Sequence, residues 1–65
     1  MSFEIELPGP LDRLTRQALA ELIGDDAFQQ RTDTVVIAIR DQAALLGALR
    51  RLHELGVTIG NVQRT

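Results

Sequence analysis

Two glutamates in one predicted strand form the first carboxylate pair that could act as a general acid and base. Glu4 and Glu6 stand two residues apart in an alternating segment, so both side chains lie on the same face of a strand. Catalysis by such a pair needs a cleft whose environment separates the two pKa values. An open sheet face does not provide that cleft, and we expect both residues to be surface carboxylates.

The other side chains that could do chemistry form no site in the sequence. The pair Asp25–Asp26 resembles the start of a calcium loop, but the next residues lack the spaced oxygen ligands that such a loop needs. His53 is the one histidine, and it has no second metal ligand at helical spacing. Gly9 precedes a predicted helix, but no lysine follows to complete a phosphate loop. Since the chain also has no cysteine, we predict no catalytic residue, no metal site and no cofactor, and hence no enzyme.

Size and composition predict one small globular domain over residues 1–65. The chain has 65 residues, a net charge of -2 and a hydrophobic content of 45%, and a core of this size is marginal. The longest apolar run, residues 35–39, is far too short to span a membrane, and we recognise no secretory signal. We therefore expect a cytoplasmic protein without membrane contacts.

Periodicity predicts a strand and then a helix in the first third of the chain. Residues 3–7 alternate between apolar and polar types, as in a half-buried strand. Apolar residues then recur at spacings of three and four, and Gly24 is a natural helix-ending residue. With Pro10 at its first position, the helix is expected over residues 10–23, with Leu14 and Leu22 on its buried stripe.

The sequence after Gly24 predicts a hairpin, a second helix and a last strand. Residues 27–31 are weakly strand-like, residues 34–40 are strongly so, and a short turn separates them. Asp41 is placed to cap a helix that Gly56 ends.

The last strand is expected to begin with Val57, Thr58 and Ile59. Its alternation slips after Gly60, and two interpretations stay open. A bulge at Gly60–Asn61 would return Val62 to the core face, or Val62 is exposed and available to a partner.

This order predicts an α+β fold of the ferredoxin-like type, βαββαβ, with a four-stranded antiparallel sheet and two helices on one face. The first and third strands would be central. Their odd-numbered residues would face the helices, and Val36 and Ala38 would leave apolar surface on the open face.

Uncovered apolar surface and free sheet edges predict association with a second copy or another protein. Gly47 lies inside the second predicted helix, where glycine costs about 1 kcal/mol relative to alanine. Either another backbone approaches it closely, from the neighbouring helix or a second subunit, or it is a tolerated surface glycine. The residues expected at an interface are Val36, Ala38, Gly47, Val57, Ile59 and Val62.

Nucleic acid is not an expected partner. An RNA-binding module with this fold stacks bases on aromatic residues of its central strands. The corresponding face here carries Glu4, Glu6, Val36 and Ala38, which offer no stacking surface, and the sequence pI is about 5.1.

The stretch from Val35 to Gln63 resembles half of an ACT-like regulatory domain. The resemblance is carried by the strand at residues 35–39, Asp41, the Leu45–Leu46 pair and the segment 55–59. It departs where Ala43 and Ala44 replace an expected proline and glycine. The resemblance implies that a small effector such as an amino acid binds near Asp41, Gln42 and Ala43. The chain is also similar to short uncharacterised actinobacterial proteins with an Asp-Gln-Ala-Ala-Leu helix.

Three functional hypotheses follow. The first is a non-catalytic interaction or regulatory module that self-associates as a homodimer through a sheet edge or the open sheet face. The second is an ACT-like sensor of a small-molecule effector. The third is an accessory subunit of an enzyme or biosynthetic complex.

Overall fold

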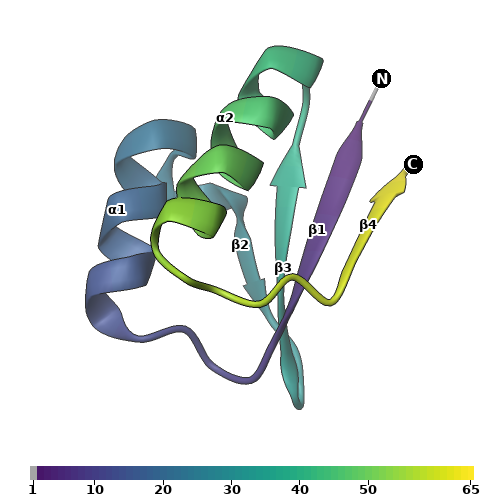
Figure 1. Cartoon of the computed structure of the whole chain (residues 1–65). Coiled ribbons are helices and arrows are strands. Elements are labelled where there is room, and N and C mark those ends of the chain that lie inside the picture. The colour runs from purple at the N-terminus through teal and green to yellow at the C-terminus, as the bar shows by residue number, and fades with distance from the viewer. Residues whose placement is uncertain (1) are drawn as a thin grey trace.

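Four antiparallel strands form one sheet, and two α-helices cover one of its faces, in the computed structural model of this chain (Figure 1). The structure describes residues 2–65. The strand order is β2-β3-β1-β4, so the first and third strands are central, as predicted. The elements are β1 (Phe3–Pro8), α1 (Arg13–Ile23), a 3-10 turn at Asp25–Ala27, β2 (Phe28–Gln30), β3 (Thr34–Ile39), α2 (Gln42–Glu54) and β4 (Asn61–Arg64).

The core lies between the helices and the two central strands. The register pairs Ile5 with Ile37 and Leu7 with Val35, and paired residues of antiparallel strands share a face. All four side chains are buried. Ile5, Leu7 and Ile37 pack with Leu19 and other residues of the two helices, which confirms the predicted assignment of strand faces.

The predicted hairpin is present, with a shorter first strand. Phe28 pairs with Ile37, and the N–H of Arg31 donates to the carbonyl of Thr34 across the turn at 2.8 Å. The 3-10 turn takes up residues 25–27, so only residues 28–30 remain extended. The sheet therefore has a very short outer edge at β2.

The first helix differs from the prediction in its start and in the side that it buries. It begins at Arg13 rather than Pro10, and the Asp12 carboxylate accepts a hydrogen bond from the Thr15 N–H at 3.0 Å. Leu14 is 75% exposed and Leu22 is 52% exposed, so their predicted places on the buried stripe are wrong. Thr15 is buried instead. Because threonine is polar, the hydropathy pattern did not assign it to the buried side of the helix.

The prediction of a strand beginning at Val57 is also wrong. Val57 and Ile59 lie in a loop and pack against the core as partly buried side chains. This segment passes from the end of α2 to the outer side of β1 before the chain turns along β1 as β4 (Figure 1). Gly60 lies at this turn, close to the backbone of β1. A Cβ on residue 60 would lie only 3.1 Å from the Glu6 carbonyl oxygen, so the close approach favours glycine.

The two helices meet at Gly47 without requiring a glycine there. A Cβ built on Gly47 would lie 3.7 Å from Cδ2 of Leu22 in α1, which is ordinary van der Waals contact. Among residues 2–65, therefore, no other backbone occupies the space that a methyl group at residue 47 would fill.

We predict that Gly47→Ala raises the free energy of unfolding by about 0.5–1 kcal/mol, since alanine restricts the unfolded chain and fits the helix. Urea denaturation of a dilute sample measures this change. Gly56→Ala is the matched control and should destabilise the fold, because residue 56 has a φ of 74°. A less stable Gly47→Ala variant would contradict the ordinary van der Waals contact that the structure shows at residue 47.

A second prediction concerns acid sensitivity at the start of α1. Hydrogen bonds from the side chain and backbone of Thr15 hold the pKa of Asp12 below its ordinary value of 3.8. A lowered pKa stabilises the folded state above the unfolded-state pKa, and this stabilisation is lost as the pH falls through the folded-state value. Asp12→Asn keeps a capping side chain that does not titrate. The melting temperature of the wild type should therefore exceed that of the variant at neutral pH, and the difference should shrink below pH 3.8. A difference that does not change with pH contradicts this assignment.

Candidate functional site

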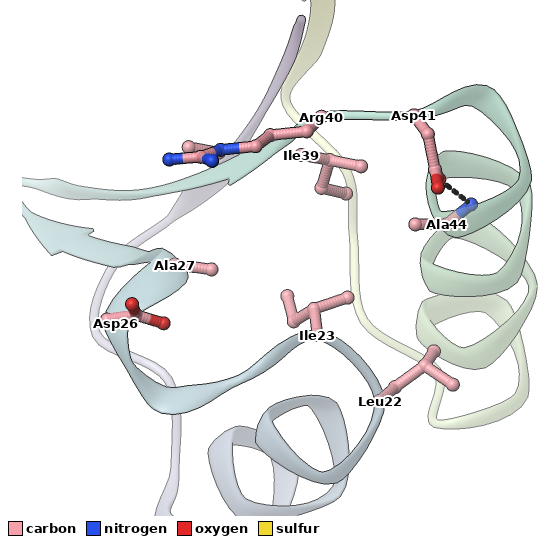
Figure 2. Close-up of a pocket in the computed structure, with 9 residues that line it drawn as sticks. Leu22, Ile23, Asp26, Ala27, Ile39, Arg40, Asp41 and Ala44 are labelled. Carbon is pink, nitrogen blue, oxygen red and sulfur yellow. Dashed lines mark hydrogen bonds between the residues drawn. The ribbon is translucent and has the colours of Figure 1, made fainter.

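A cavity of about 440 Å³ opens where β3 leads into α2 (Figure 2). Its apolar lining comes from the end of α1, the 3-10 turn, the end of β3 and the first turn of α2. The residues concerned are Leu22, Ile23, Ala27, Ala38, Ile39 and Ala44. The cavity thus joins two stretches that are distant in the sequence, residues 22–27 and 38–44.

Three charged residues, Asp26, Arg40 and Asp41, complete the lining. Figure 2 shows Asp26 beside Ala27 on one side of the cavity, whereas Asp41 lies across from it beside Ala44. The side chain of Arg40 extends from the end of β3 toward the side where Asp26 lies. Within residues 2–65 the one ion pair joins Arg51 to Glu54, so no salt bridge neutralises the charges around the cavity.

Asp41 is oriented by its role as the N-cap of α2. Its Oδ1 accepts a hydrogen bond from the backbone N–H of Ala44 at 2.7 Å, which confirms the predicted cap. The buried strand β3 ends at Ile39 and α2 begins at Gln42. Arg40 and Asp41, the two residues between them, therefore lie at the cavity wall. An apolar floor with one guanidinium and two carboxylates suits a small amphipathic molecule that carries both charges.

The structure brings only part of the predicted effector set to this cavity. Asp41 lines it, whereas Gln42 and Ala43 are exposed on the first turn of α2 and are not part of its lining. Sequence reasoning missed Asp26 and Arg40. Both residues line the cavity because β2 pairs antiparallel with β3. No local sequence motif predicts that the start of one strand lies near the end of the other.

The open sheet face does not present the apolar patch that was expected. Val36 is only 2% exposed, so its predicted place on uncovered surface is wrong. The register sets Glu6 on one side of it and Gln29 on the other, and these longer side chains flank the valine. Ala38 is exposed, but a single alanine makes a small apolar surface.

The free edge of β4 is the second candidate site. All four of its residues are exposed, and Val62 pairs with Ile5, which places it on the helix side of the sheet. This register agrees with the interpretation that returned Val62 to the core face. Val62 is still 39% exposed, because no helix lies over β4 (Figure 1). Val57 and Ile59 pack on the core instead of extending this edge.

The backbone groups of this edge can be assigned from the ladder. The N–H of Thr65 donates to the Ser2 carbonyl at 2.8 Å, and hydrogen-bonded pairs alternate along antiparallel strands. The N–H of Gln63 therefore faces β1, and a bond from Gln63 Nε2 to Glu4 Oε1 at 3.3 Å adds to the pairing. The N–H groups of Val62 and Arg64 face away from the sheet.

Over residues 2–65, no group of three or more histidine, aspartate or glutamate side chains lies close enough together to hold a metal ion. None of the helices there has the length and apolar character needed to cross a bilayer.

Comparison with known proteins gives one match. A search of curated proteins found none that matches, and a search of solved structures likewise found none. The family model described as a domain of unknown function, DUF8691, matches residues 2–63. Because this match covers nearly the whole sequence, the chain belongs to the DUF8691 family.

Proposed function

We propose that this chain is a non-catalytic interaction module that self-associates through the free edge of β4. The observation that carries this proposal is the exposed strand whose outward N–H and carbonyl groups have no partner within the sheet. Unpaired strand edges of this kind are templates for pairing with another chain. A second copy fits best, because a two-fold axis brings two identical antiparallel edges together.

The arrangement of elements supports a ferredoxin-like fold for this module. The chain order is strand, helix, strand, strand, helix, strand, and β1 and β3 are central. Both helices lie on one face, which leaves the sheet edges open in the manner that this fold class implies.

Interface size decides which surfaces must take part. A stable interface buries about 800 Å² per partner, which is about a sixth of the 4527 Å² surface of this chain. The edge at β2 offers only three residues, and the open face lacks a large apolar patch. The β4 edge has four exposed residues and Val62 beside them, so it is the better starting point for an interface. Small domains also gain stability from such association.

A second candidate function is effector sensing, and the cavity at the start of α2 favours it. Its lining suits a zwitterion whose ammonium group approaches Asp26 and whose carboxylate approaches Arg40, with an apolar part against Ile23 and Ile39. An apolar amino acid has this chemistry. The ACT-like resemblance of residues 35–63 implies the same ligand class.

Self-association is tested by removing one outward donor. Arg64→Pro deletes an N–H that faces away from β1, and its ring blocks the approach of a second strand. We predict that this variant weakens the dimer by about tenfold or more, the effect of losing a central interface contact. Arg64→Ala keeps the N–H and should change the dissociation constant little. Sedimentation equilibrium over a range of concentrations measures both. A wild-type chain that stays monomeric at high micromolar concentration rules out the proposal.

Effector sensing is tested by thermal shift with a panel of L-amino acids. A ligand that binds only the folded state raises its stability, and we expect at least one apolar amino acid to raise the melting temperature by several degrees. Arg40→Gln should abolish this shift. Arg31→Gln is the matched control, because Arg31 is exposed and is not part of the cavity lining. The absence of any shift across the panel, or a full shift in Arg40→Gln, excludes this function.

A further inference from the structure

The helix layer is displaced toward the β2 edge of the sheet and leaves β4 bare. The guanidinium carbon of Arg16 in α1 lies 4.9 Å from the ring centre of Phe28 in β2, so α1 sits over that edge. Packed helices lie about 8–10 Å apart and strands about 4.8 Å apart. In Figure 1, α2 lies nearest to β3, and β1 separates β3 from β4. The helix-side face of β4 is therefore uncovered, and so is the flank of α2 that is turned toward it. We call the surface formed by these two parts the α2–β4 step.

The α2 wall of this step combines Leu46 and the partly buried Leu49 with the polar side chains of Gln42 and His53. Leu45, Ala48 and Leu52 face the sheet, and Gly47 faces α1, because Leu22 lies beside it. At 100° per residue, Leu46 lies on the flank that is turned away from α1 and toward β4. Leu46 is 59% exposed, and no element of residues 2–65 covers it.

The β4 floor adds one apolar side chain and one cation. Val62 and Arg64 pair with Ile5 and Phe3, which places both on the helix side of the sheet. Arg50 is exposed one helical turn after Leu46 in α2, so it provides a second cation next to that leucine.

No carboxylate of α2 or β4 faces these cations. The carboxylate of Glu54 pairs with Arg51 at 3.4 Å, on the flank of α2 that faces α1. Glu4 accepts from Gln63 on the opposite face of the sheet. The chain carries a net charge of -2, yet this step brings two exposed apolar side chains, Leu46 and Val62, together with two cations.

We propose that the step between α2 and β4 binds an acidic amphipathic helix of a partner protein. A third helix beside α2, at the usual helix–helix distance of about 8–10 Å, lies over β1 and β4. Its apolar stripe then covers Leu46 and Val62, while its acidic side chains approach Arg50 and Arg64. This mode of recognition is helix-in-groove binding, and it goes beyond the self-association proposed above.

The test uses a fluorescent synthetic peptide of about 18 residues, long enough to form a helix. Leucine stands at spacings of three and four, and glutamate and alanine fill the other positions. A scrambled peptide of the same composition is the control. We expect the patterned peptide to bind the full chain in an anisotropy titration, the scrambled peptide to bind at least about tenfold more weakly, and added salt to weaken binding.

Two matched variants locate the site. Leu46→Glu should weaken peptide binding by about tenfold or more. Leu14→Glu makes the same change at a leucine of α1 that is 75% exposed, and it should leave binding within about twofold. Equal affinity for both peptides, or equal losses in both variants, overturns the inference. Absent peptide binding together with intact dimerisation also overturns it and leaves the proposed self-association standing.

Discussion

The antiparallel register of β1 against β3 is the constraint on which the rest of this structure depends. It pairs Ile5 with Ile37 and Leu7 with Val35, so every second side chain of two strands meets the helices. A slip of one residue would turn this whole set to the opposite face. The buried leucines and alanine of α1 and α2 then have one surface on which to pack.

The same constraint determines where the molecule is left open. Because the core is centred on β1 and β3, the two helices gather over these strands and over β2, and β4 is held by β1 alone. The direct passage from β3 into α2 leaves two charged residues, Arg40 and Asp41, at the wall of a cavity. Both candidate sites therefore follow from the position of the core rather than from a sequence motif.

Local signals were sufficient for the central elements of the fold. The alternation in β1, the apolar run of β3 and the cap at Asp41 each depend on neighbouring residues, and all three predictions are confirmed. Tertiary context decided the rest. Thr15 is buried on the side of α1 where hydropathy predicted leucines. Val57 and Ile59 pack against the core from a loop, not from a strand. Asp26 and Arg40 line one cavity because β2 folds back along β3. The spacing of these residues in the sequence does not predict this.

The central claim is that β4 has one bonded edge and one free edge, and that the free edge carries association. Residue-resolved amide hydrogen exchange as a function of protein concentration tests it most directly. In dilute solution the Gln63 amide should exchange slowly and the amides of Val62 and Arg64 quickly. In concentrated solution the latter two should become protected. If Val62 and Arg64 exchange at the same fast rate at every concentration, the free edge does not carry association and the account fails.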